Sequence, residues 1–190
     1  RGTCSTERDD VKVELYNKYE DLPLVNTGCD SYASWDPRFK HLSPTYEIDD
    51  VVNKLVDLLP NPNKELGSYW HLPNGNDVHL VITGGEPLLG WQRAYKELLS
   101  HPKMFDLMNI TFETNGTQPL QPELKKYLKQ WKRSSRDITF SVSAKLSASG
   151  ESWEDAIKPD VVCEYQEYGT TYLKFVVEKP SDFDEVDRAV

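Results

Sequence analysis

The chain has 190 residues, of which 38% are hydrophobic and 28% charged, a composition that excludes a disordered or collagen-like protein and predicts a packed domain. Its 22 Lys and Arg residues against 31 Asp and Glu residues leave a net charge of −9, which repels phosphate backbones and disfavours nucleic acid as a partner. A membrane-spanning helix needs roughly 20 apolar residues, and the apolar runs here are far shorter, so we expect no membrane span.

Residues 1–46 show no sustained hydrophobic period, and we expect an irregular insertion there. The chain opens on Arg1 without an initiator Met or a signal peptide, and we expect it to be part of a longer protein. The three cysteines, Cys4, Cys29 and Cys163, are an odd number with no close pair. This argues against a disulfide framework and predicts a reducing, cytoplasmic environment.

From residue 47 to 190 the sequence alternates between helix and strand patterns, which predicts one β/α domain. An amphipathic helix covers residues 48–59, and strands start near residues 78, 110, 138 and 171, spaced by 32, 28 and 33 residues. The helices between them use apolar positions near residues 91–99, 120–131 and 153–157, and another begins near 183. Lysines at 125, 126, 129 and 132 read as a solvated helix face. The fold class is therefore α/β with a parallel sheet, either open or part of a barrel, and ligands of both architectures bind at the carboxyl ends of the strands.

Glycines follow the first strand, in Thr83-Gly84-Gly85-Glu86-Pro87. Glycines let a ligand approach the backbone, and the carboxylate of Glu86 suits an ammonium group. A structural turn that leads into a helix started by Pro87 is the alternative.

The second and third strands also end in polar residues. Glu113 and Asn115 are two residues apart, so on an extended strand end they point to one side and could hold a polar ring; a tight loop is the alternative. Ser141, Ser143 and Lys145 share a side of the third strand for the same reason, where Lys145 faces either a ligand or solvent.

Upstream, Cys29 and Ser31 in Gly28-Cys29-Asp30-Ser31 could supply a thiolate for iron and a hydroxyl for magnesium, or Cys29 could be inert.

Together these segments resemble the radical S-adenosylmethionine superfamily and, within it, the 7-carboxy-7-deazaguanine synthase family of queuosine biosynthesis. The matching stretches are CDSYASW (29–35), HLVITGGEPLLGWQ (79–92), ITFETNGTQ (110–118), FSVSAKLSASGE (140–151) and YLKFVV (172–177). The resemblance implies an incomplete parallel β/α barrel with a [4Fe–4S] cluster, S-adenosylmethionine and Mg²⁺. The implied reaction is the radical ring contraction of 6-carboxy-5,6,7,8-tetrahydropterin to 7-carboxy-7-deazaguanine, with loss of ammonia.

By position, the resemblance implies that Cys29 binds the cluster and that Ser31, where the family has threonine, binds Mg²⁺. Cofactor contacts would come from Gly84, Gly85, Glu86, Ser143, Ala144 (where the family has proline) and Lys145. Thr83, Glu113 and Asn115 would face the pterin, with Glu113 and Asn115 as the catalytic pair.

The family places two further cluster cysteines ahead of this motif, and no such pair stands here. We expect them upstream of Arg1, residues 1–46 then including the remnant of the cluster loop, and we expect further substrate contacts beyond Val190; Cys4 as a ligand is the alternative. A flavodoxin or ferredoxin would donate the electron, and a homodimer is compatible with the resemblance. Two other readings stay open: another radical enzyme such as a glycyl-radical activase, and a module without a cluster that binds a nucleotide or a protein.

Overall fold

The computed structural model describes residues 15–22, 32–60 and 68–190. Its centre is a four-stranded sheet in the order β1-β2-β3-β4, in which every neighbouring pair is parallel. The strands are β1 (His79–Ile82), β2 (Asn109–Thr114), β3 (Asp137–Ser143) and β4 (Thr170–Lys174). The predicted α/β class with a parallel sheet is confirmed, and all four strands start within one residue of the predicted positions, although the fourth ends at Lys174 and not at Val177.

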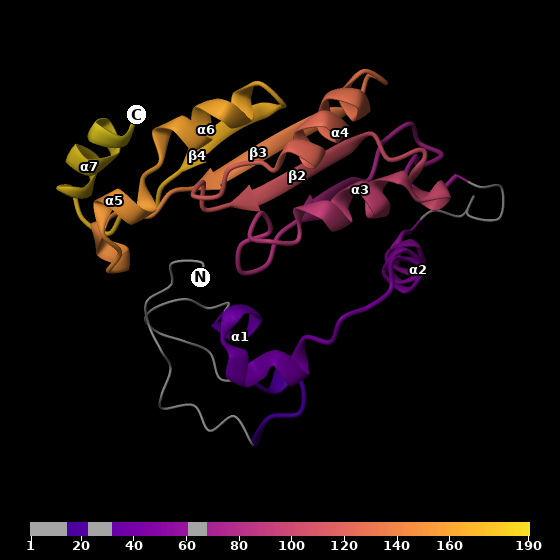
Figure 1. The fold of residues 1–190 in the computed structure, drawn as a ribbon, viewed down its shortest axis with the longest axis horizontal. Coiled ribbons are helices and arrows are strands. Elements are labelled where there is room, and N and C mark those ends of the chain that lie inside the picture. Colours follow the sequence, from indigo (N-terminus) through magenta and orange to yellow (C-terminus); the bar gives the residue numbers. More distant parts are fainter. Residues whose placement is uncertain (1–14, 23–31, 61–67) are drawn as a thin grey trace.

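Helices follow the strands and cover one face of the sheet (Figure 1). A strand order that advances one step at each connection keeps the crossover helices on one face, because parallel β-α-β connections are right-handed. The helices are α1 (Tyr32–Trp35), α2 (Ile48–Leu58), α3 (Gln92–Ser100), α4 (Pro122–Lys132), α5 (Trp153–Ala156), α6 (Pro159–Gln166) and α7 (Asp182–Ala189), with short 3-10 turns η2 (Tyr19–Asp21), η3 (Pro37–Leu42), η5 (Pro102–Met104) and η6 (Ser147–Ser149).

The main core lies between the sheet and helices α2, α3, α4 and α6. Phe112 of β2 stacks on Phe140 of β3 with ring centroids 5.5 Å apart, and Phe140 stacks on Tyr165 of α6 at 4.6 Å. Tyr95 of α3 meets Phe112 edge to face. Since side chains alternate along a strand, the even-numbered residues of β2 and β3 face the helices and the odd-numbered ones face the other way.

The side of the sheet away from the helices carries mainly polar side chains, and we call it the polar face. Its members, paired by strand register, are His79, Val81, Thr111, Glu113, Thr139, Ser141, Ser143, Tyr172 and Lys174. The predicted common side of Ser141 and Ser143 is therefore confirmed.

Several helices differ from their predicted form. Trp91, placed on the apolar face of its helix by spacing, is 60% exposed and only precedes α3, whereas Gln92 is buried. Helix α6 was not predicted, because its apolar residues make a weak stripe. Within residues 1–46, described in part, helix α1 and the turn η3 pack together around a small separate core of Ala33 and Phe39.

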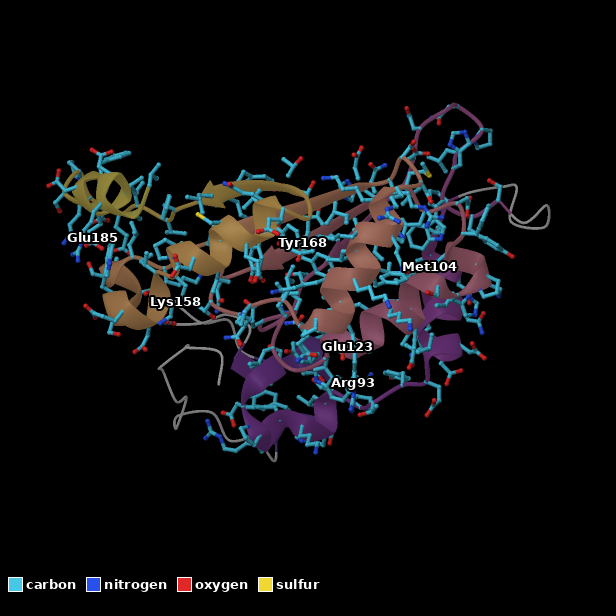
Figure 2. The ribbon with its side chains drawn as sticks, turned by 45° about the horizontal axis from the view of Figure 1, so that its top comes forward. Arg93, Met104, Glu123, Lys158, Tyr168 and Glu185 are labelled. Atoms are coloured by element: carbon cyan, nitrogen blue, oxygen red, sulfur yellow. The ribbon has the colours of Figure 1, made fainter. Side chains whose placement is uncertain are left out.

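The lysines of α4 behave largely as predicted. Lys126, Lys129 and Lys132 are exposed. The ammonium of Lys129 lies 5.0 Å from the ring centroid of Tyr168, just beyond α6 (Figure 2). Lys125 is half-buried and forms an ion pair with Glu164 of α6.

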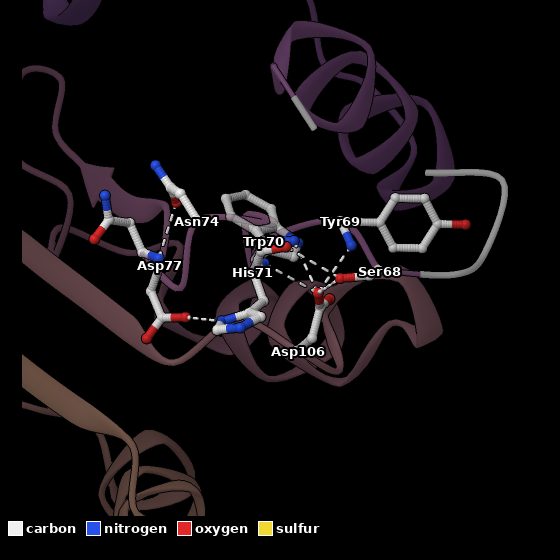
Figure 3. A network of polar contacts seen from close by, with 8 residues as sticks. Ser68, Tyr69, Trp70, His71, Asn74, Asp77 and Asp106 are labelled. Atoms are coloured by element: carbon white, nitrogen blue, oxygen red, sulfur yellow. Dashed lines mark hydrogen bonds and ion pairs between the residues drawn. The ribbon is translucent and has the colours of Figure 1, made fainter. Parts of the chain in front are cut away.

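A carboxylate organises the amino end of the sheet (Figure 3). Asp106 Oδ2, in the segment before β2, accepts hydrogen bonds from the backbone N–H groups of Tyr69, Trp70 and His71 at 2.8, 2.9 and 3.2 Å. It thereby fixes the chain that leads into β1, at the end of the sheet opposite the strand-end loops.

Candidate functional site

The loops that follow β1 and β2 are joined by the carboxylate of Glu86. Its Oε1 accepts hydrogen bonds from Thr114 Oγ1 at 2.6 Å and from the backbone N–H of Leu88 at 3.1 Å. Its Oε2 accepts one from the backbone N–H of Asn115 at 2.8 Å. A carboxylate has about four acceptor sites, so these three bonds leave Oε2 able to accept one more. The structure thus brings together the Gly-Gly-Glu loop and the Glu-Thr-Asn-Gly loop, two of the predicted segments.

Glycines leave the backbone before Glu86 accessible. Thr83, Gly84 and Gly85 are exposed. Gly84 has φ of +129°, and a Cβ added to it would meet nothing within 4 Å. The space beside Gly84 therefore allows a ligand to approach the backbone at the end of β1.

The side chain of Asn115 is partly used inside its own loop. Its Oδ1 accepts hydrogen bonds from the backbone N–H of Thr117 at 3.0 Å and from Thr117 Oγ1 at 2.7 Å. This is the tight loop that the Asn-Gly pair indicates. The amide nitrogen of Asn115 is then the group left to donate to a ligand.

The segment from Thr114 to Gln121 is held from both flanks by buried side chains that sequence reasoning did not single out. Gln92, 2% exposed, donates from Nε2 to the carbonyls of Leu88 and Pro119 and accepts at Oε1 from the backbone N–H of Gln121 at 2.7 Å. A polar residue beside the apolar stripe of a helix was the only available signal for it.

Helix α6 supplies the opposite flank. Tyr165 donates from its hydroxyl to the carbonyl of Gln118 at 2.5 Å, and Glu164 Oε1 accepts from the backbone N–H of Leu120 at 3.1 Å. Burial raises the pKa of Tyr165, so its hydroxyl stays protonated and remains a donor.

Tyr95 supports the first loop in the same way. Its hydroxyl donates to the carbonyl of Pro87. Burial, with the negative charge of Glu86 as a smaller cause, raises the pKa of Tyr95 to about 12. Both tyrosines therefore serve as neutral hydrogen-bond donors at neutral pH.

Glu113 and Lys174 form an ion pair on the polar face, with Lys174 Nζ 3.2 Å from Glu113 Oε1. Their side chains are 41% and 45% exposed, respectively. Ser143 and Lys145 are half-buried and Ala144 is buried at the end of β3. At the other end of the face, Thr111 Oγ1 and His79 Nε2 share a hydrogen bond of 2.7 Å.

The metal-binding predictions lie outside the described part of the chain. Cys29, Ser31 and Cys4 are not among the described residues. Cys163 is described, and it is an exposed free thiol on α6. No group of three or more His, Cys, Asp or Glu residues in 15–22, 32–60 and 68–190 is arranged to hold a metal ion. Within those same ranges, no helix has the length and apolar content that crossing a membrane requires.

Four parallel strands with intervening helices, and hydrogen-bonded loops at their carboxyl ends, define an α/β protein whose candidate site lies at that edge of the sheet. The chain is 32% identical over 168 residues to the 7-carboxy-7-deazaguanine synthase of Pyrobaculum aerophilum, covering 88% of this chain and 60% of that protein. It is 30% identical over 162 residues to the protein of the same name from Halobacterium salinarum, covering 84% of this chain and 54% of that protein. No protein-family model and no solved structure gives a significant match.

This chain is similar to two proteins named 7-carboxy-7-deazaguanine synthase, the family that its sequence motifs resemble. It spans little more than half the length of the curated relatives it matches. Neither relative favours the glycyl-radical activase or the module without a cluster.

Proposed function

We propose that the protein containing this chain is a radical S-adenosylmethionine lyase that converts 6-carboxy-5,6,7,8-tetrahydropterin to 7-carboxy-7-deazaguanine. The similarity to two synthases of that name supports the reaction. The observation that carries the site is the carboxylate of Glu86, which joins the loop of the proposed cofactor residues Gly84 and Gly85 to the loop of the proposed substrate residue Asn115.

The proposed architecture is an incomplete β/α barrel. The sheet advances from β1 to β4 without reversing, and its helices lie on one face. This is the arrangement of consecutive barrel strands, whereas a doubly wound sheet reverses its order and carries helices on both faces. The polar face would then line the inside of the barrel.

S-adenosylmethionine would bind along the edge formed by the ends of β1 and β3. The exposed backbone of Gly84 and Gly85 and the remaining acceptor site of Glu86 suit its amino-acid end, because an ammonium group needs carbonyl or carboxylate acceptors. Ser143, the backbone of Ala144 and Lys145 would contact another part of the cofactor. Lys145 has no ion-pair partner among the described residues, so its ammonium is available to an oxygen of the ligand.

Cys29 would bind one iron of a [4Fe–4S] cluster and Ser31 a Mg²⁺ ion. A thiolate is the usual protein ligand of such clusters, and a hydroxyl oxygen suits a hard cation. When bound, the cluster and S-adenosylmethionine would supply the radical chemistry that removes hydrogen from the substrate. A flavodoxin or ferredoxin is the proposed electron donor, and the cytoplasm is the proposed location.

The chain's own residues would bind and orient the pterin. Glu113 would accept hydrogen bonds from ring N–H groups, and the amide nitrogen of Asn115 would donate to a ring acceptor. Thr83 would contact the same ring from the end of β1. Glu86, Gln92 and Tyr165 would keep the loop of Asn115 in place through the bonds described above.

The test is anaerobic reconstitution of the full-length protein with iron and sulfide, followed by incubation with S-adenosylmethionine, Mg²⁺, a reductant and the carboxypterin. We expect cluster absorbance and formation of 7-carboxy-7-deazaguanine. Cys29→Ala should abolish cluster assembly, whereas Cys163→Ala, at an exposed thiol on α6, should retain it. A reconstituted protein that holds the cluster but forms no product would contradict the proposed reaction.

The magnesium ligand has its own test. Ser31→Ala should leave cluster content unchanged and alter the dependence of turnover on Mg²⁺ concentration, because it removes one oxygen ligand. An unchanged metal dependence would show that Ser31 does not bind the ion.

A further inference from the structure

The ion pair between Glu113 and Lys174 crosses β3, a strand that contains neither residue. Glu113 is on β2 and Lys174 on β4, and β3 lies between these two strands. In the register of the sheet, Glu113 is level with Ser141, and Lys174 is level with Ser143. The pair therefore crosses β3 over the side on which the two serines point.

Ser141 lies beneath this ion pair, and its hydroxyl makes no hydrogen bond among the described residues. The residue is 0% exposed. A buried hydroxyl without a partner is unfavourable, so folded proteins rarely keep one. A ligand that reached this position would relieve the cost by accepting from, or donating to, the hydroxyl.

The covering pair is of a kind that a ligand can displace. Both side chains are more than two-fifths exposed and are joined by a single contact. Exposed pairs of this kind contribute little stability, because water solvates the separated charges almost as well. Separation would release an ammonium and a carboxylate on either side of the hydroxyl of Ser141.

We propose that the Glu113–Lys174 pair is a displaceable cover of a binding site for a carboxylated nitrogen heterocycle. The carboxylate of the ligand replaces Glu113 as the partner of Lys174, the freed Glu113 accepts hydrogen bonds from ring N–H groups, and Ser141 bonds to the ring between them. Lys174 then has the ligand carboxylate as its partner and Glu113 has the ring N–H donors, so neither group of the separated pair is left without a hydrogen-bond partner. This inference rests on the proposed function, since the proposed substrate has these groups, and it adds Lys174 and Ser141 to the site.

The test measures dissociation constants for two fluorescent aromatic pterins, with and without a 6-carboxylate, on the full-length protein in the presence of S-adenosylmethionine. The wild type should prefer the carboxylated pterin by about tenfold, the scale of one charge-assisted contact. Lys174→Gln should remove that preference without weakening the binding of the pterin that lacks the 6-carboxylate. Lys126→Gln, at an exposed lysine of α4, is the matched control and should keep it.

Ser141→Ala separates a binding role from a structural one. It should weaken both pterins about threefold to tenfold, the loss of one hydrogen bond, without lowering the thermal unfolding midpoint, because the hydroxyl has no partner to lose. A lowered midpoint with unchanged affinity would make the hydroxyl structural and overturn its place in the site.

The remaining outcomes distinguish this inference from the proposed function. If the wild type binds the carboxylated pterin and Lys174→Gln keeps the preference, the proposed displacement of the Glu113–Lys174 pair is wrong, and the proposed substrate is unaffected. If neither pterin binds the wild type, both the proposed substrate and the cover are overturned.

Discussion

At the scale of single residues, burial near the strand ends does not always follow residue type. Gln92 stands next to an exposed tryptophan, yet it is the buried member of the pair because three backbone groups of two loops need its amide. A side-chain amide can donate and accept at once, so one residue satisfies both carbonyls and an N–H group.

Gln92→Leu should lower the free energy of unfolding by about 2–4 kcal/mol, because it leaves buried carbonyls and an N–H group without partners. Trp91→Ala, at the exposed neighbour, should change it by no more than about 0.5 kcal/mol. Urea denaturation of both variants measures the difference. Equal effects would show that the hydrogen bonds of Gln92 contribute little.

Two glycines of the site have a positive φ, but only Gly116 is closely packed. At Gly116, with φ of +78°, an added Cβ would lie 2.6 Å from Val142 Cγ1, whereas the same atom at Gly84 would meet nothing within 4 Å. Gly116→Ala should therefore cost about 2–4 kcal/mol from strain and overpacking together. Gly84→Ala should cost about 1–2 kcal/mol from strain alone. Thermal or urea unfolding compares them, and a larger loss at Gly84 would contradict the packing argument.

At the scale of elements, two carboxylates fix α7: Glu185 bonds it to η6, and Asp182 bonds it to the segment just before the helix. Glu185 accepts hydrogen bonds from the backbone N–H of Ser147 at 2.9 Å and from its hydroxyl. Asp182 accepts from the backbone N–H groups of Glu178 and Lys179 at 2.9 and 3.2 Å. These bonds hold the pKa of both carboxyl groups below their ordinary values of 4.5 and 3.8.

A lowered pKa in the folded state makes the attachment of α7 sensitive to acid. The stabilisation is complete above the ordinary carboxyl pKa and is lost as the pH falls below it, through the lower pKa of the folded state. Amide hydrogen exchange in α7, corrected for the intrinsic rate, should therefore accelerate as the pH falls below about 4. Glu185→Gln should weaken that dependence, whereas Glu167→Gln, at an exposed carboxylate after α6, should not. Exchange in α7 that is independent of pH would contradict the attachment.

At the scale of the whole molecule, the aromatic stack connects the sheet to its helices. Phe140 is fully buried between Phe112 of β2 and Tyr165 of α6. The same tyrosine holds the loop at Gln118, so core packing and loop position share a side chain.

Phe140→Ala should destabilise the protein by about 3–5 kcal/mol, because it opens a cavity in the centre of this stack. Phe183→Ala, at a phenylalanine that is 57% exposed on α7, should cost about 0.5 kcal/mol or less. Urea unfolding checks both values. A small loss at Phe140 would show that the helices reseat around the gap.

The sequence by itself determined the alternation of strands and helices, because period 2 and period 3.6 are local properties of a chain. It also placed Glu86, Glu113, Asn115 and Lys145 at strand ends. The tertiary structure alone decided which groups these side chains meet. The carbonyl of Pro119 is 27 residues from Gln92, the carbonyl of Gln118 is 47 residues from Tyr165, and Glu113 and Lys174 are separated by 61. Backbone N–H and C=O groups in these loops have no backbone partner and bond instead to side chains that are distant in the sequence. A local sequence pattern cannot predict such contacts.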